Sequence, residues 1–222
     1  MSIKILVMSC DKNYDIFDAF HHCIEKYWEN HPEIIYSLET FTNPYYKTIN
    51  KNIPLEKWSK RVRETVKEID AEYILFMIDD LFIREQVDNQ KILNLCQYIK
   101  GNVAALNLEQ SFDPLDKPLN NEILIRNRFG EYRTSCMCQI WQKEAMLKLF
   151  NLELNPWQFE KANIGLNYTF LISKNGDLLN FGKKKGEWRF GIVKGKWTKE
   201  CKEFLDKENI QINYVIRGFI KE

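Results

Sequence analysis

The sequence predicts an α/β fold in which helices flank a mostly parallel central sheet. Apolar, β-prone runs alternate with amphipathic helical patterns through the first 108 of the 222 residues, which is the order that βαβ units produce. The runs at residues 3–8 and 73–78 are continuously apolar, as is typical of strands covered on both faces. No repeat or low-complexity linker interrupts the chain. We therefore expect a single domain over residues 1–222, Rossmann-like in its first half and mixed in its C-terminal part.

Four strands and three helices are expected before residue 109. The strands are residues 3–8, 33–38, 73–78 and 103–108. Apolar side chains recur at helical spacing between them: Phe17, Phe20, Ile24 and Tyr27 in the first helix, Trp58, Val62, Val66 and Ile69 in the second, and Ile92, Leu95, Cys96 and Ile99 in the third. Residues 40–54 are rich in Asn, Pro, Thr and Tyr and are expected to form a loop.

The second half of the chain has a weaker pattern. Residues 132–141 are expected to form a strand, and residues 142–150 a helix. Another helix is expected to begin at Pro156, because proline after Asn155 fits the first helical position.

Composition indicates an ordinary globular protein. Lys and Arg number 32 and Asp and Glu 31, so the net charge of +1 argues against a strongly basic nucleic-acid binder. No apolar window is long enough to span a membrane, and the N-terminus lacks the features of a signal peptide. The six cysteines form no disulfide-type or zinc-type pattern. We therefore expect a cytoplasmic protein with reduced thiols and no nucleic-acid partner.

The sharpest chemical signal is the pair Asp79-Asp80, at the end of the most apolar strand. Ligands of open α/β sheets bind at the carboxyl ends of the strands. Adjacent carboxylates repel one another unless a cation or hydrogen-bond donors compensate. Mg²⁺ and Mn²⁺ prefer oxygen ligands and are often shared with substrate phosphates. The pair therefore indicates metal or phosphate chemistry, with capping of the following turn as the alternative.

Seven short segments occur in a recognisable order: residues 3–11, 58–61, 72–82, 132–135, 140–144, 156–160 and 193–197. Together they resemble bacterial glycosyltransferases of the GT-A fold that are found in capsule and other surface-polysaccharide gene clusters. The resemblance covers about residues 3–200. It implies a nucleotide-sugar donor, first of all a UDP-sugar, bound by residues 1–108. It also implies an oligosaccharide or lipid-linked glycan acceptor, bound by residues 109–222.

On the donor side, the resemblance assigns roles to three groups of residues. Ser9, Cys10 and Asp11 end the first strand, where such enzymes place the base and ribose of the nucleotide. Arg61 would face the nucleotide or its phosphates, with a surface arginine as the alternative. Asp79 and Asp80 stand where the Asp-x-Asp motif of the fold lies, and would hold Mn²⁺ or Mg²⁺. This chain departs from that motif because it has no residue between the two acids.

On the acceptor side, Glu160 matches the acidic residue that serves as general base in inverting members. An inverting transferase needs a carboxylate that takes the proton of the acceptor hydroxyl. A position near a helix N-terminus is expected to favour the ionised form of Glu160. Arg133 and Trp141 are expected to contact the acceptor, Arg133 through a phosphate or an acidic sugar. Trp157 is a candidate for stacking on a sugar, with packing in the core as the alternative.

The segment 182–222 has eleven basic and six acidic residues. Its lysines, Lys194 and Lys196 among them, lie among glycines and tryptophans. Three interpretations stay open. The segment is a solvated hairpin, a loop that closes over the donor pyrophosphate, or a surface that attracts an anionic membrane on which the acceptor is anchored.

Two other functions are compatible with these patterns. A sugar nucleotidyltransferase on a similar sheet usually carries a glycine-rich phosphate loop early in the chain, but residues 9–13 contain no glycine. A non-catalytic binding module for glycan or nucleic acid would use the 14% aromatic content and the basic tail, but would give the acidic pair no role.

Overall fold

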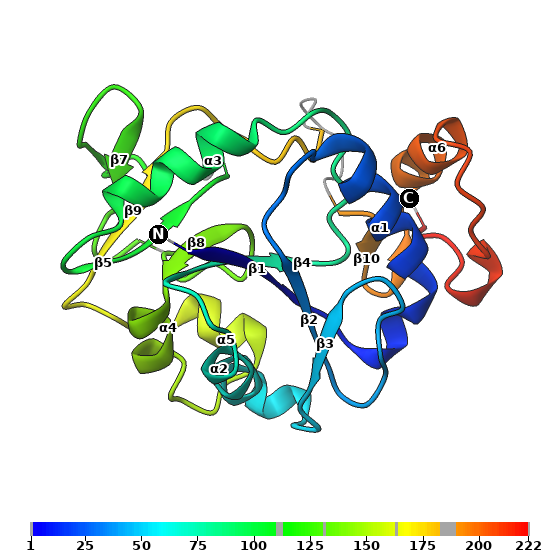
Figure 1. Ribbon diagram of the computed structural model, residues 1–222, viewed down its shortest axis with the longest axis horizontal. Helices are drawn as coiled ribbons and strands as arrows, with labels where there is room; N and C mark the ends of the chain where they lie inside the picture. Colours follow the sequence, from blue (N-terminus) through cyan, green and yellow to red (C-terminus); the bar gives the residue numbers. More distant parts are fainter. Residues whose placement is uncertain (1, 110–112, 131, 163, 183–189, 222) are drawn as a thin grey trace.

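The computed structural model describes residues 2–109, 113–130, 132–162, 164–182 and 190–221. Within these residues, nine strands form one mixed sheet (Figure 1). In spatial order they are β3 (Lys47–Asn50), β2 (Ile34–Leu38), β1 (Ile3–Met8), β4 (Tyr73–Ile78), β8 (Gln139–Gln142), β5 (Val103–Asn107), β9 (Thr169–Ser173), β7 (Ile123–Ile125) and β6 (Lys117–Pro118). This arrangement confirms the predicted α/β class.

Strands β3, β2, β1 and β4 are parallel, and β5 is parallel to β9. The strand β8 runs antiparallel between β4 and β5. The carboxyl ends of β1 and β4 therefore meet at one edge of the sheet, because Met8 pairs with Ile78. This edge is where the acidic pair leaves β4.

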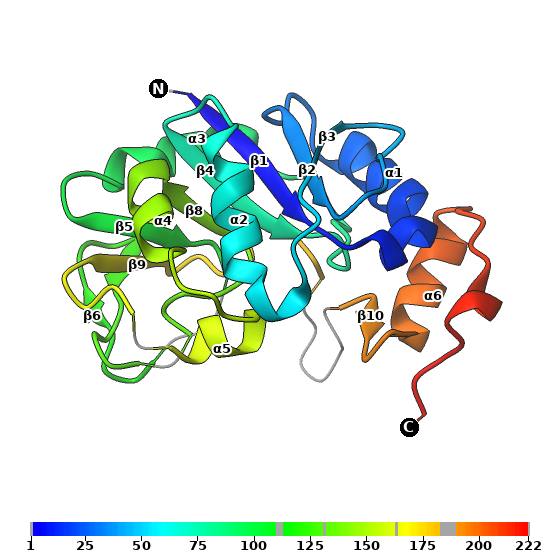
Figure 2. The same ribbon diagram turned by 90° about the horizontal axis from the view of Figure 1, so that it is seen from below.

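Helices cover both faces of the sheet (Figures 1 and 2). The helices α1 (Phe17–Tyr27), α3 (Asn89–Leu95) and α6 (Lys199–Lys207) pack into one core cluster. The helices α2 (Trp58–Lys67), α4 (Lys143–Leu149) and α5 (Pro156–Lys161) pack into the other. Alternation along β4 supplies both clusters, since Leu75 and Met77 face one and Ile74 and Phe76 face the other.

Short 3₁₀ helices connect several elements. They are Asp11–Ile16, Leu55–Lys57, Cys96–Tyr98 and Tyr214–Ile216. A small antiparallel hairpin of β10 (Ile192–Val193) and β11 (Lys196–Trp197) precedes α6. All six cysteines are free thiols, as expected. No helix within the described ranges is both long and apolar enough to cross a membrane.

Two predicted elements need correction. The expected loop 40–54 contains the edge strand β3, which pairs with β2. The expected strand 132–141 is a strand only from Gln139 onward. Tyr132 has φ of +57°, which an extended strand does not accommodate. Side-chain hydrogen bonds hold the irregular stretch that follows, including one from Gln139 Nε2 to the backbone oxygen of Arg133 at 3.1 Å.

Candidate active site

A cavity of about 380 Å³ lies at the carboxyl ends of β1 and β4. Residues of helices α2 and α5 line it, together with Met137 and Phe190. It brings together seven of the residues predicted from the sequence: Ser9, Cys10, Arg61, Asp79, Asp80, Trp157 and Glu160. These residues come from both halves of the chain, so the fold assembles one site from the predicted donor and acceptor sides.

Asp79 is buried and both of its carboxylate oxygens accept hydrogen bonds. Ser9 Oγ donates to Oδ2, and Asn13 Nδ2 donates to Oδ1 at 2.9 Å. Burial raises the pKa of Asp79 to about 6, although the hydrogen bonds from Ser9 and Asn13 act in the opposite direction. Asp79 is therefore tied to β1 and to the 3₁₀ turn that follows it.

Asp80 has a different environment. Its Oδ1 is buried and has no hydrogen-bond partner among the described residues. Its backbone oxygen accepts a hydrogen bond from Gly191 N at 2.7 Å. Burial and the neighbouring charge of Asp79 raise the pKa of Asp80 to about 7. Of the two acids, Asp80 is the one with an oxygen available to a ligand.

Arg61 and Asp11 brace the ends of β1 and β2. Arg61 is buried; its Nη2 donates to Ser9 O at 2.5 Å and its Nη1 pairs with Glu39. Asp11 does not line the cavity. Its carboxylate instead accepts hydrogen bonds from the backbone amides of Glu39, Thr40 and Phe41. Together these contacts hold the strand ends from which Ser9 and Cys10 reach the cavity.

Glu160 lies one turn into α5, on the other side of the cavity from the strand ends. The helix begins at Pro156 as expected, and Asn155 and Gln158 form a capping box at its start. Glu160 Oε1 accepts a hydrogen bond from Cys136 N at 2.8 Å. Burial raises the pKa of Glu160, although the hydrogen bonds from Cys136 and Ser135 act in the opposite direction, as the helix N-terminus is also expected to do. A raised pKa makes the carboxylate a stronger proton acceptor.

The rim of the cavity is apolar. Trp157 is 63% exposed and Leu55 51% exposed, and both line the cavity. The alternative that Trp157 packs in the core is therefore wrong. Trp58, by contrast, is buried in the core and packs against Phe76 and Phe159, as expected. An exposed indole at the rim of the cavity is suited to stacking on a sugar ring.

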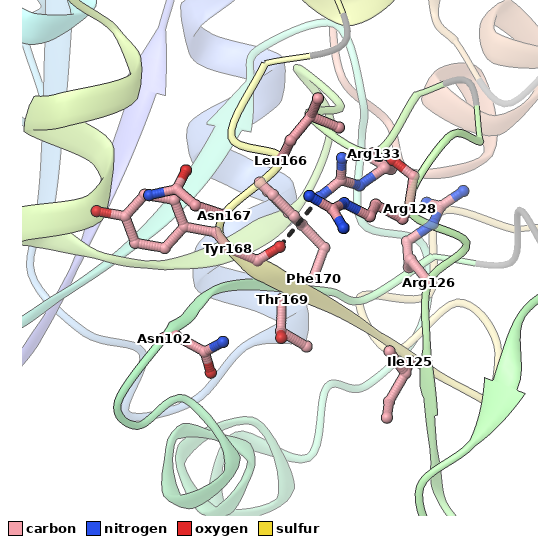
Figure 3. A pocket seen from close by; sticks show the side chains of 10 residues that line it. All are labelled: Asn102, Ile125, Arg126, Arg128, Arg133, Leu166, Asn167, Tyr168, Thr169 and Phe170. Carbon is pink, nitrogen blue, oxygen red and sulfur yellow. Dashed lines mark hydrogen bonds between the residues drawn. The ribbon is translucent and has the colours of Figure 1, made fainter.

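Trp141 and Arg133 lie elsewhere. Trp141 has no exposed surface and packs against Phe150 and Phe170. It belongs to the central strand β8, both faces of which are covered, so it cannot contact an acceptor. Arg133 lines a second cavity, and Figure 3 shows it beside Tyr168, whose backbone oxygen accepts a hydrogen bond from it at 3.2 Å. Neither residue lines the first cavity.

Lys194 and Lys196 lie on the hairpin of β10 and β11 and are exposed. Lys194 and Gly195 form its two-residue loop, both with positive φ. Neither lysine lines the cavity, so the structure does not bring them to the predicted donor site. Lys183, Lys184 and Lys185 lie outside the described residues.

Sequence reasoning missed two polar residues of the site. Asn13 was identifiable, because its amide follows the first strand within the polar turn. Arg217 gave no local signal. Its guanidinium pairs with Asp15 and donates to Asn13 Oδ1 at 3.0 Å, and its charge lowers the pKa of both Asp79 and Asp80 against the larger effect of burial.

Known proteins resemble this chain in fold but not detectably in sequence. No family model matches the chain, and no curated protein sequence matches it. A structure of S. aureus TarS is similar, with a TM-score of 0.51 and 12% identity over 78% of this chain and 35% of TarS. Residues 1–349 of TarS in complex with UDP-GlcNAc give 0.49 and 13%, over 92% of this chain and 64% of that fragment. A 4-diphosphocytidyl-2C-methyl-D-erythritol synthase gives 0.47 and 12%, over 84% and 95%.

The chain thus spans about a third of the length of TarS and less than two thirds of the 1–349 fragment. At sequence identities this low, the structural similarity establishes the fold alone. With its mostly parallel sheet and the antiparallel strand β8 inserted between β4 and β5, the chain has a GT-A-like α/β fold.

Proposed function

We propose that the chain is a glycosyltransferase that moves a sugar from a nucleotide-sugar donor to a carbohydrate acceptor with inversion. One observation carries the proposal: a single cavity joins the acidic pair at the end of β4 to a carboxylate on the facing helix α5. Such an arrangement has a place for the donor phosphates on one side and a base for the acceptor on the other.

The donor would lie against the ends of β1 and β4. Ser9 and Cys10 would meet the nucleoside, and Asp80 would lie near the diphosphate. UDP-sugars are the first donors to test, as UDP-GlcNAc is the sugar nucleotide in one of the TarS structures. Arg61 would support this site by bracing β1, since its guanidinium is already engaged by Ser9 O and Glu39.

A divalent metal, Mn²⁺ or Mg²⁺, fits the residues only if the donor shares in binding it. The described residues contain no group of three or more His, Cys, Asp or Glu side chains that could hold a metal ion. Asp80, with its unpartnered buried Oδ1, would be the principal protein ligand, and Asp79 would support it. Mg²⁺ is commonly held in this way, by one or two carboxylates plus substrate phosphates. When bound, the metal would offset charge on the leaving diphosphate.

Glu160 would act as the general base. Its carboxylate takes the proton of the acceptor hydroxyl while that oxygen bonds to the anomeric carbon, and the nucleotide leaves with the electrons of the broken bond. The backbone amide of Cys136 fixes one oxygen of Glu160 and so orients the other. Trp157 would stack on the acceptor sugar, an oligosaccharide or a lipid-linked glycan. The exposed lysines of the β10–β11 hairpin would favour an anionic membrane face that carries such a glycan.

The proposal is tested by a thermal-shift screen of UDP-, GDP-, CDP- and dTDP-sugars, with and without Mn²⁺. A ligand that binds only the folded state raises the melting temperature, so the correct nucleotide should stand out. Hydrolysis of that donor then separates an enzyme from a binding module. Formation of a nucleotide sugar from a nucleoside triphosphate and a sugar phosphate would contradict the proposal and favour a nucleotidyltransferase.

A further inference from the structure

Two 3₁₀ turns, one after β1 and one near the C-terminus, expose apolar side chains to solvent. In the C-terminal turn, Tyr214–Ile216, the side chains of Val215 and Ile216 are 90% and 47% exposed. Tyr14, in the turn after β1, is 53% exposed, and its ring centroid lies 6.3 Å from that of Phe41, which is 48% exposed. Single exposed apolar residues are ordinary, but a contiguous group of them marks a surface that another molecule covers.

Side-chain contacts join the segments that carry these residues. Arg217, directly after the C-terminal turn, pairs with Asp15, the neighbour of Tyr14. The backbone amide of Phe41 donates to the carboxylate of Asp11 at 3.1 Å, at the start of the turn that contains Tyr14. The exposed apolar side chains therefore belong to three segments that contact one another. We call Tyr14, Phe41, Val215 and Ile216 together the apolar ridge.

The loop of the β10–β11 hairpin lies at the same end of the molecule as the C-terminal turn. Trp197 of β11 forms a parallel bridge with Phe219, and its amide donates to Gly218 O at 3.0 Å. In a parallel pair, the residues that precede the two bridged positions extend in the same direction. The hairpin loop, with Lys194 and Lys196, precedes Trp197, and the turn with Val215 and Ile216 precedes Phe219. The two lysines are thus placed beside the apolar ridge.

The unpaired charge beside the apolar ridge is positive. Three exposed lysines in these segments form no ion pair with another described residue: Lys12, Lys194 and Lys196. The acids of the turn after β1 are engaged, since Asp15 pairs with Arg217 and Asp11 accepts backbone amides. Helix α6 carries both signs of charge, and its Asp206 pairs with Lys202. Exposed apolar side chains among unpaired cations are suited to an anionic lipid surface.

We propose that the apolar ridge and these three lysines dock the protein on an anionic lipid bilayer. Val215 and Ile216 enter the headgroup region, and the lysines contact the anionic headgroups. The docking surface adjoins the candidate active site, because Asn13, the neighbour of Tyr14, lines the cavity. A lipid-linked acceptor in the same bilayer would therefore be presented beside that cavity. This last step rests on the proposed transferase function, whereas the docking itself does not.

Cosedimentation with lipid vesicles tests the docking surface. The probes are vesicles of phosphatidylglycerol and phosphatidylcholine in a one-to-two mixture, compared with vesicles of phosphatidylcholine alone. The wild type should bind the anionic vesicles more tightly, and added salt should weaken this binding. The variant Val215→Ser with Ile216→Ser should bind the anionic vesicles about tenfold or more weakly, because apolar area is no longer buried. Lys194→Gln with Lys196→Gln should lose about tenfold or more through the missing charges.

The matched control is Leu115→Ser with Leu119→Ser. These leucines are 67% and 48% exposed and flank β6, which lies at the opposite end of the molecule from α6 (Figure 2). This control should bind vesicles like the wild type. Urea denaturation should give all variants the free energy of unfolding of the wild type, since the replaced side chains are exposed.

Three results would overturn the docking surface: no binding to anionic vesicles, equal binding to neutral vesicles, or equal binding by the wild type and both surface variants. A wild-type dimer that Val215→Ser with Ile216→Ser abolishes, without vesicle binding, would overturn it in favour of a second copy of the chain. Donor hydrolysis in the absence of vesicles should be the same for Val215→Ser with Ile216→Ser and for the wild type. Its absence from both proteins would refute the transferase function while leaving the docking surface standing.

Discussion

At the residue scale, the neighbouring acids Asp79 and Asp80 have separate tasks. Both oxygens of Asp79 are engaged by Ser9 and Asn13, whereas Oδ1 of Asp80 is buried without such a partner in the described structure. Burial raises their pKa values to about 6 and about 7. An unfolded aspartate titrates near 3.9, so the folded state holds more protons between about pH 4 and 7. Ionisation of this pair costs the folded state more than the unfolded state, so the free energy of unfolding falls as the pH rises through that window.

Replacing Asp80 tests this division. Asp80→Asn should lower turnover by about 10²–10³, because an electrostatic contact to the transferring group is lost. The free energy of unfolding at pH 8 should not fall, and should rise slightly, since a buried charge is replaced by a neutral side chain of the same shape. Urea denaturation and donor turnover measure the two effects. The exposed Asp206→Asn is the control. Full activity would remove Asp80 from the site, and a marked loss of stability would favour the turn-capping alternative.

Glu160→Gln should bind the donor normally and transfer sugar about 10²–10⁴ times more slowly, because glutamine cannot accept the proton. The base works only when deprotonated, so activity falls as the pH drops through its pKa. Burial raises that pKa above the ordinary 4.5, and the acid limb of the wild-type profile should lie correspondingly higher. The variant should lack this limb. A wild-type rate, or a product that keeps the donor's anomeric configuration, would contradict the assignment.

At the scale of elements, the hairpin of β10 and β11 is anchored beside the acidic pair by Gly191. Its amide donates to Asp80 O, and Thr198 N donates to Gly191 O at 3.0 Å. A side chain does not fit at this position. A Cβ on Gly191 would lie 2.9 Å from Cys201 Sγ and closer still to the ring of Phe82. The backbone therefore passes close to Phe82, and the neighbouring residue Phe190 lines the cavity.

Gly191→Ala should therefore lower the free energy of unfolding by about 1–3 kcal/mol, the usual cost of overpacking a core. It should also reduce turnover, because the backbone of Asp80 moves with the hairpin. Chemical denaturation and steady-state kinetics measure both. Gly101→Ala is the matched control, since Gly101 has φ of +60° and open space around it, and should cost only about 1 kcal/mol. Equal free energies of unfolding for the two variants would show that the hairpin can shift to accommodate the added methyl group without a cost from overpacking.

The sequence predicts correctly those helices and strands whose formation depends on residues close together in the chain. The apolar runs of β1 and β4 and the helix start at Pro156 are read directly from neighbouring residues, and the structure confirms them. The edge strand β3 and the central strand β9 were missed, and residues 132–138 were assigned to a strand. Short strands depend on the partners beside them, which the sequence does not reveal.

The dependence on neighbouring elements also explains which residues of the candidate site the sequence predicts correctly. Residues at strand ends, such as Ser9 and Asp80, were found because the sheet brings such ends together. Trp141 was misassigned because its burial depends on Phe150 and Phe170, which approach from other elements. The second cavity, which Arg133 lines, could not be foreseen as a unit, since its lining residues are far apart in the sequence, at Asn102, in residues 125–133 and in residues 166–170.

At the scale of the whole molecule, the C-terminal segment returns to the 3₁₀ turn that follows β1. Arg217 reaches across 202 positions of sequence to Asp15, in the 3₁₀ turn after β1. Both side chains of this ion pair are buried. Arg217 also donates to Lys12 O and to Asn13 Oδ1, each at 3.0 Å. Since Asn13 in turn donates to Asp79, the C-terminal segment supports the acidic pair through two contacts.

Arg217→Met should therefore affect both stability and the site. Removing one partner of a buried ion pair leaves the other charge uncompensated, which typically costs about 3–5 kcal/mol. Lys202→Met is the control, because its pair with Asp206 is exposed and should contribute less than about 1 kcal/mol. The double variant Arg217→Met with Asp15→Leu should recover part of the loss, since no unpaired charge remains. Donor affinity should stay low in that variant if Arg217 also positions Asn13. Recovery of stability together with full donor affinity would show that the ion pair serves the fold alone.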